Sequence, residues 1–152
     1  MDIIIETATT EHVRQLAKNI RSNDQLEANK LGIEPHKGLF VAYRQSILRR
    51  SALLNGGVIA MWGIAGTPLS KTGQPWLITG EGVNKISPIK FARLYKEQVQ
   101  DMKAYFDVLS NYVDAEYEGA VRMLKIAGFT LSEPFPLGPQ KSMFRLFSMV
   151  NI

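Results

Sequence analysis

Hydrophobic positions in the second half of the chain recur first with the period of a helix and then with that of strands. The apolar residues of segment 87–106 are spaced four, four, three and four positions apart, which places them on one helical face: Phe91, Tyr95, Val99, Met102 and Phe106. Polar and charged residues fill the other faces. Ser87 as N-cap and Pro88 at the first helical position mark where the helix begins. We expect its apolar face to pack on a sheet.

Apolar runs on either side of this helix predict two strands, at residues 76–79 and 106–113. A polar loop, 80–85, joins the first run to the helix. A short helix follows the second run and ends at Gly128; its predicted inward residues are Ala120, Met123, Leu124 and Ala127. The order strand, loop, helix, strand, helix is one that many proteins use to build a cleft for a phosphate-bearing cofactor.

Strand patterns also occur near both ends of the chain. Residues 3–6 predict a short first strand, and residues 47–54 and 58–64 predict a hairpin turned by Asn55 and Gly56, which tolerate positive φ. We expect residues 67–75 to form a loop. Segment 132–141 holds three prolines and is expected to be partly irregular, and 143–150 reads as a closing strand.

Helices are predicted between the first strand and the hairpin. Thr9 or Thr10 is the expected N-cap of the first helix. Asp24 is the expected cap of a second helix, which bears Leu26 and Leu31 and is ended by Gly32 and Pro35. A further turn or two is expected to start near Lys37.

The composition excludes several classes of protein but does not indicate a function. The chain has 152 residues, of which 45% are apolar, and we expect a single domain over residues 1–152. It has no cysteine, no apolar run of membrane-spanning length and no signal-peptide pattern at its start. The net charge is +4, but the basic residues are scattered, which argues against a nucleic-acid partner. His12 and His36 have no nearby ligand cluster, so no metal site is predicted.

The order of the predicted elements resembles the GNAT acetyltransferase fold. We therefore expect an α/β (α+β) domain with a GNAT-like mixed sheet of about six to seven strands flanked by about four helices. In that family acetyl-CoA lies between the splayed fourth and fifth strands, and its pyrophosphate rests on backbone amides at the start of the next helix, here 81–87. The cofactor-binding residues that the resemblance implies are Ile78, Gly80, Asn84, Lys85, Ser87 and Asn111.

Two departures from the GNAT pattern point away from catalysis. Segment 80–88 does not keep the glycine spacing of the family's phosphate loop. In the last helix, 117–129, the family's alanine, glycine and phenylalanine are present. Tyr117 stands at the family's asparagine position, however, and Leu124 stands where the proton-donating tyrosine is often found. A leucine cannot donate a proton, so catalysis stays an open question. No cofactor is expected if the chain is not an enzyme, and acetyl-CoA is expected if it is.

The chain is also similar to phage proteins of the internal virion protein A type, found in short-tailed coliphages. The matching stretches cover most of the chain: 26–35, 60–63, 76–79, 109–114, 122–129 and 144–147. This resemblance implies a virion-associated or virion-assembly protein on a GNAT-like scaffold, without catalysis. It implies other phage virion or assembly proteins as partners, and the host cytoplasm during assembly, or the virion, as its location.

Several charged residues have two interpretations. Glu81 is a weak candidate for a general base at the mouth of the cleft, and the alternative is a solvated loop carboxylate. Asp114, Glu116 and Glu118 suit an acidic site or, as we prefer, the capping of the last helix by Asp114 or Glu116.

Apolar residues occupy both faces of the C-terminal hairpin, which suggests a homo-oligomer or virion interface. Three functions therefore remain after the sequence analysis. They are a non-catalytic phage assembly protein, an acetyl-CoA-dependent N-acetyltransferase of unknown acceptor, and a small module that binds a host protein.

Overall fold

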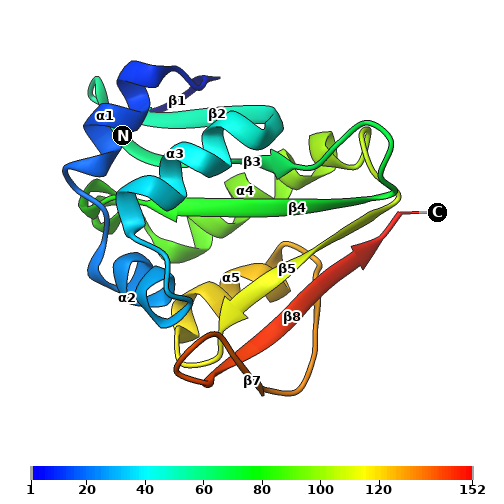
Figure 1. Cartoon of the computed structure of the whole chain (residues 1–152). Helices are drawn as coiled ribbons and strands as arrows, with labels where there is room; N and C mark the ends of the chain where they lie inside the picture. The colour runs from blue at the N-terminus through cyan, green and yellow to red at the C-terminus, as the bar shows by residue number, and fades with distance from the viewer. Residues whose placement is uncertain (1, 152) are drawn as a thin grey trace.

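The computed structural model describes residues 2–151, which form one mixed sheet with helices on both faces (Figure 1). The strands are β1 (Ile3–Thr7), β2 (Ser46–Leu54), β3 (Gly57–Ala65), β4 (Thr72–Thr79), β5 (Val108–Asp114), β6 (Thr130–Leu131), β7 (Phe135–Leu137) and β8 (Ser142–Val150). The helices are α1 (Thr10–Ala17), α2 (Ser22–Lys30), α3 (Pro35–Gln45), α4 (Pro88–Met102), α5 (Glu118–Ile126) and the short 3-10 helix η1 (Glu81–Lys85). The expected α+β architecture is confirmed, with eight strands and five α-helices in the described part of the chain.

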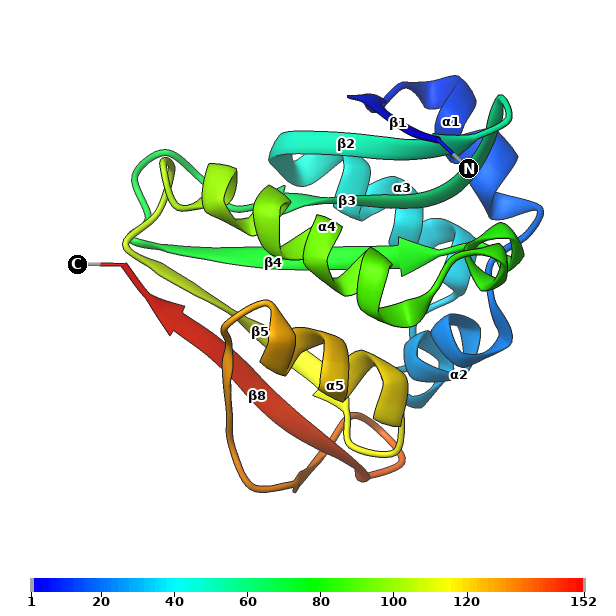
Figure 2. The same cartoon turned by 180° about the vertical axis from the view of Figure 1, so that it is seen from behind.

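The sheet runs in the order β1-β2-β3-β4-β5-β8-β6, and β7 pairs with β8. All neighbours are antiparallel except β4 and β5, which are parallel. That parallel pairing is very short, since it comprises only Thr72 with Val108 and Gly73 with Leu109. Beyond it the two strands spread apart, as both views show (Figures 1 and 2).

Pro75 explains where β5 leaves β4. The side-chain amide of Asn111 on β5 donates to the Pro75 carbonyl at 3.0 Å, so this carbonyl faces β5. The N–H and C=O of one strand residue point to the same side, and proline has no N–H to offer there. The ladder to β5 therefore stops, while the pairing of β4 with β3 continues to Thr79.

Each face of the sheet has its own core. Helices α1 and α3 cover one face, and α4 and α5 cover the other (Figures 1 and 2). The core on the α4 side includes Trp62 on β3 and Tyr95 on α4, whose rings meet edge to face with centroids 6.3 Å apart. The core under α1 and α3 includes Leu16 and Leu39, neither of which is exposed. Helices thus pack on both faces of a sheet in which β4 and β5 separate toward one end.

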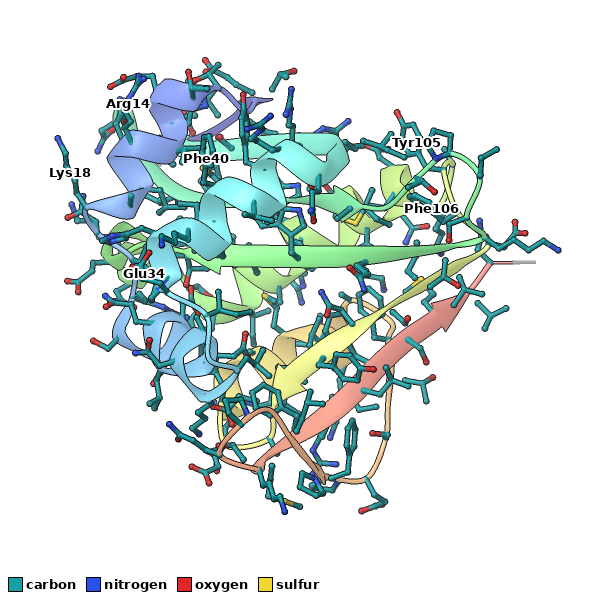
Figure 3. All side chains as sticks on the ribbon, in the orientation of Figure 1. Arg14, Lys18, Glu34, Phe40, Tyr105 and Phe106 are labelled. Carbon is teal, nitrogen blue, oxygen red and sulfur yellow. The ribbon has the colours of Figure 1, made fainter. Side chains whose placement is uncertain are left out.

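The predicted course of β4 was wrong at its beginning. The strand starts at Thr72 instead of residue 76, and the expected loop is correspondingly shorter. Gly73 fits here because the ring of Phe106 would lie 2.3 Å from a Cβ at this position. Figure 3 shows Phe106 beside the end of the molecule where β4 and β5 meet. Phe106 itself follows α4, which ends at Met102, so the last position of the predicted helical face lies outside the helix.

Two predicted caps were also wrong. Helix α2 begins at Ser22, and its N-cap residue Arg21 makes no side-chain cap bond. Asp24 instead accepts hydrogen bonds from the N–H and hydroxyl of Thr79, while Leu26 is 50% exposed. Helix α5 has Tyr117 as N-cap without a side-chain cap bond.

Some apolar residues of the C-terminal strands lie in the core, and others lie on the surface. Phe144 and Phe147 of β8 are buried, whereas Met143 and Val150 are exposed. Within segment 132–141, which was expected to be partly irregular, β7 pairs with β8, and β6 pairs with β8 just before this segment. The oligomer or virion interface suggested for this hairpin stays a hypothesis.

The start of α1 offers a first test. Thr9 Oγ1 accepts from the His12 N–H at 3.2 Å, and His12 Nδ1 accepts from the Thr9 N–H at 3.3 Å, a reciprocal cap. Thr9→Ala removes the hydroxyl and is expected to lower the free energy of unfolding by about 1 kcal/mol, measured by urea titration. Thr10→Ala, at the next and equally exposed position, serves as control and should change it by less than about 0.5 kcal/mol.

Candidate functional site

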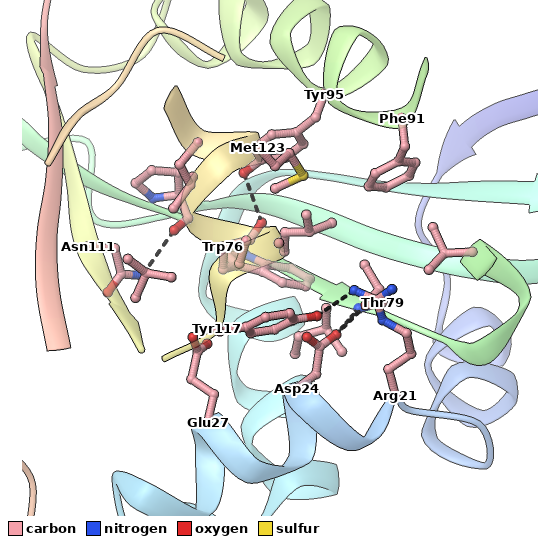
Figure 4. Close-up of a pocket in the computed structure, with 18 of the residues that line it drawn as sticks. Arg21, Asp24, Glu27, Trp76, Thr79, Phe91, Tyr95, Asn111, Tyr117 and Met123 are labelled. Atoms are coloured by element: carbon pink, nitrogen blue, oxygen red, sulfur yellow. Dashed lines mark hydrogen bonds between the residues drawn. The ribbon is translucent and has the colours of Figure 1, made fainter. Parts of the chain in front are cut away.

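The space between the diverging strands is a cavity of about 770 Å³ (Figure 4). Residues of β4 and β5 frame it, α2 and α3 line it from one face of the sheet, and α4 and α5 line it from the other. Its walls are mostly apolar and include Leu39, Trp76, Phe91 and Leu124. A volume of this size, with apolar walls and a few polar groups, is typical of sites for small molecules.

A network of polar side chains crosses one wall of this cavity. Arg21 donates to the Tyr117 hydroxyl and, at 3.1 Å, to Asn84 Oδ1 of η1. The Tyr117 hydroxyl also hydrogen-bonds the carboxylate of Asp24, whose Oδ2 accepts from the N–H and hydroxyl of Thr79 at the end of β4. The network ties the start of α2, the end of β4 and the start of α5 together.

A second polar group on α2 reaches β5. Glu27 Oε2 accepts from the Asp114 N–H at 2.9 Å. One turn later, Lys30 Nζ lies 2.8 Å from Asp114 Oδ2 and 3.4 Å from Glu116 Oε2. Asp114, one of the two residues expected to cap α5, is therefore the buried partner of Lys30, and its Oδ1 accepts from the Glu116 N–H.

Burial shifts the protonation of these groups. Burial first, and then the neighbouring charges of Asp24 and Asp114, raise the pKa of Glu27 to about 7, against the lowering effects of the Asp114 N–H and Lys30. Burial likewise raises the pKa of Asp24, although the hydrogen bonds from Thr79 and Tyr117 oppose this. The pKa of the Tyr117 phenol is raised, mainly by burial and then by the charge of Asp24. Shifted pKa values of side chains that line a cavity are common at functional sites.

The structure brings three of the six predicted cofactor residues to the cavity wall: Ile78, Asn84 and Asn111. Gly80, Lys85 and Ser87 do not line it. Gly80 is buried with its N–H on the Ile59 carbonyl, Lys85 is exposed, and Ser87 caps α4. Glu81, the weak candidate for a base, is also exposed and outside the cavity, which suits a solvated carboxylate.

Four backbone N–H groups in the loop before α4 are already bonded within the chain. The N–H groups of Gly80, Glu81, Val83 and Ile86 donate to carbonyls of the chain itself, on Ile59, Asn19, Gly80 and Val83 respectively. Pro88 has no N–H, and the Lys90 N–H is directed at Ser87 Oγ. The open strand gap suits an extended thioester arm, and Arg21 is a side-chain cation on its wall that would pair with a pyrophosphate group.

Sequence reasoning missed Arg21, Asp24 and Glu27 as parts of this site. The signal present in the sequence is an acidic pair three positions apart, Asp24 and Glu27, in the second predicted helix. No group of three or more His, Asp or Glu residues within 2–151 is placed to hold a metal ion. None of the helices described for the chain is long and apolar enough to cross a membrane.

By sequence, the chain matches no known family profile and no curated protein. By structure, it is similar to Ard1 from Thermoplasma volcanium, with a TM-score of 0.72 and 10% identity over 100% of this chain and 99% of that chain. It is also similar to spermidine N-acetyltransferase from Vibrio cholerae, solved with CoA and spermine, with a TM-score of 0.70 and 12% identity over 98% and 95% of the two chains. A third similar structure is a GNAT-family acetyltransferase from Streptococcus pneumoniae, with a TM-score of 0.68 and 15% identity over 99% of this chain and 100% of that chain. Likeness at such identity shows the fold alone: the chain has the GNAT fold.

Proposed function

We propose that this chain is an N-acetyltransferase that moves an acetyl group from acetyl-CoA to an amine. The observation that carries the proposal is the cavity between β4 and β5, which residues from both faces of the sheet line. Two molecules entering from opposite faces would meet inside it, and holding two reactants together supplies a large part of the rate of such a transfer.

The backbone of β4 provides a suitable donor at this place. The Pro75 carbonyl and the Thr79 N–H both point away from β3, toward Asn111 and Asp24 respectively. Alternation along the strand therefore points the Leu77 N–H the same way, into the gap, beyond the last residue that pairs with β5. A fixed N–H in an apolar cavity is the type of group that stabilises a developing oxyanion. Bound acetyl-CoA would supply the acetyl group as a thioester, with Ile78 and Asn111 beside it.

Filling the cavity tests this assignment. Ala120 of α5 lines the cavity and is half-buried, so Ala120→Phe puts a ring into the space that the cofactor arm needs. Calorimetric titration of the wild type with acetyl-CoA should give a dissociation constant below about 100 μM, equivalent to about 5.5 kcal/mol. We expect Ala120→Phe to weaken binding at least about tenfold, which is about 1.4 kcal/mol. Ala104→Phe, at an exposed position outside the cavity, should bind like the wild type.

A second function is favoured by a different observation. Four loop N–H groups bonded within the chain, and the buried Leu124 in place of a proton donor, suit a GNAT scaffold without catalysis that serves in phage assembly. If acetyl-CoA and CoA both fail to bind at 1 mM, roughly the weakest affinity that calorimetry resolves, we favour this assembly role. Mass spectrometry of virions and assembly intermediates from a phage that encodes the chain should then detect it.

A further inference from the structure

Glu27 has spare hydrogen-bonding capacity on the wall of the cavity. Its Oε2 is fixed by the Asp114 N–H, while Oε1 has no hydrogen-bond partner among the described residues. Figure 4 shows Glu27 rising from α2 beside the ring of Tyr117, on the opposite side of the cavity from Phe91 and Tyr95 of α4. A carboxylate with one oxygen fixed is oriented and can still accept a further donor.

Asp24, one helical turn earlier, differs from Glu27 in this respect. Thr79 donates twice to its Oδ2, and Tyr117 hydrogen-bonds it as well. Asp24 is therefore committed to holding α2 on β4. The comparison singles out Glu27 as the cavity carboxylate on α2 that a ligand can engage.

A second hollow of about 320 Å³ adjoins this side of the cavity. The two share part of their lining, including Ile33, Ala42, Trp76 and Asn111. Apolar surface near the half-buried carboxylate of Glu27 suits a molecule that has a cationic end and an apolar body, because the charge is paired while the body leaves water.

We propose that Glu27 binds the ammonium group of the acceptor on the α2 side of the cavity and takes one proton from it. The step converts R–NH₃⁺ and the Glu27 carboxylate into R–NH₂ and the neutral carboxyl, which frees the nitrogen lone pair; the proton then leaves to water. The acceptor class that follows is a primary amine on an apolar body. This inference rests on the proposed transfer to an amine, but amine binding by Glu27 can be tested without acetyl-CoA.

The electrostatics around Glu27 suit this role. A carboxyl with a pKa of about 7 exchanges protons readily near neutral pH. The charged and titratable groups nearby are Asp24 and Lys30 on α2, Arg21 before it, Asp114 at the end of β5, and Glu116 and Tyr117 before α5. Three of the neighbouring groups are carboxylates and two are cations, so an incoming ammonium group adds a positive charge where acidic groups are in excess.

Amine binding without cofactor is the first measurement. Hexylamine and hexanol have the same apolar body and differ in charge, so calorimetry with both isolates the ammonium contact. Glu27→Gln keeps the shape of the side chain. We expect it to weaken the binding of hexylamine at least about tenfold and to leave the binding of hexanol unchanged. Glu118→Gln removes an equal charge from an exposed position that does not line the cavity, and it should leave the affinities for hexylamine and hexanol unchanged. Equal hexylamine affinity in Glu27→Gln and the wild type would overturn the proposal.

The pH dependence is the second measurement. Because the pKa of Glu27 is higher in the folded state than its ordinary 4.5, the wild type should lose more stability than Glu27→Gln as pH rises from about 4.5 to 7. The wild-type kcat/KM for acetyl transfer should rise through an inflection near pH 7, which Glu27→Gln should also lack. If Glu27→Gln is active and keeps the inflection of kcat/KM near pH 7, the role of Glu27 is refuted, whereas the proposed acetyl transfer still stands. Glu27-dependent amine binding without any transfer refutes the proposed function and supports the inference.

Discussion

Replacing Gly63 by alanine is expected to destabilise the protein by about 3 kcal/mol, which for a chain of this size lowers the melting temperature by about 10 °C. A Cβ at this position of β3 would lie 2.3 Å from the Leu48 carbonyl oxygen, 3.2 Å from the Arg49 Cα and 3.1 Å from the Trp76 indole nitrogen. Two of these atoms are backbone of β2, so relief requires β2 and β3 to separate in the centre of the sheet. Urea denaturation followed by tryptophan fluorescence measures the change, because Trp76 lies at the same contact.

Gly57 at the beginning of the same strand provides the matched control. The nearest atom to a Cβ there is the Leu54 carbonyl oxygen at 3.7 Å, which is ordinary contact, and its φ is not in the positive region. Gly57→Ala should therefore change the free energy of unfolding by no more than about 0.5 kcal/mol, or stabilise slightly by restricting the unfolded chain. Equal effects at the two positions would mean that the β2–β3 contact adjusts freely, contrary to the packing described.

Features of this fold that depend on neighbouring residues could be predicted from sequence. Ser87 and Pro88 start α4 as expected, and Asn55 and Gly56 form the hairpin turn with φ of 51° and 83°. The closing strand was also predicted within a residue of its bounds. In each case the signal and the structure it specifies lie within a few residues of one another.

The first half of β4 could not be predicted because its residues read locally as breakers. Gly73 and Pro75 are typical of loops, yet here one makes room for Phe106 and the other ends the pairing with β5. Both reasons involve contacts with residues more than 30 positions away. A glycine or proline selected by distant packing has no separate local signature.

The same limit applies to the site. Asp24 and Glu27 bond to Thr79 and Asp114, which are 55 and 87 residues away in sequence. An acidic residue early in a helix is explained equally well as a cap, which is the role we predicted for Asp24. Ile78, Asn84 and Asn111 were found only through the resemblance to GNAT proteins, because topology brings the end of β4 and the middle of β5 to one cavity.

The ion pair between Lys30 and Asp114 carries the other large expected effect. Asp114 is 2% exposed and depends on Lys30 for a compensating charge at 2.8 Å. Lys30→Met keeps much of the aliphatic stem but leaves the carboxylate buried and unpaired, for which we expect a loss of about 3 kcal/mol at pH 7. Since the hydrogen bond to Asp114 raises the pKa of Lys30 above its usual 10.5, this loss should persist from pH 7 up to about pH 10.5 and shrink above it.

The double variant decides whether charge or packing is responsible. Adding Asp114→Asn to Lys30→Met removes the unpaired charge, and replacing both members of a buried pair often costs little, so most of the lost stability should return. Lys96→Met, at an exposed position on α4, should change the free energy of unfolding by less than about 0.5 kcal/mol. If the double variant is no more stable than Lys30→Met, the lysine stem and not its charge holds α2 against β5. Because α2 also carries Glu27, the same urea titrations report how firmly the wall of the cavity is held.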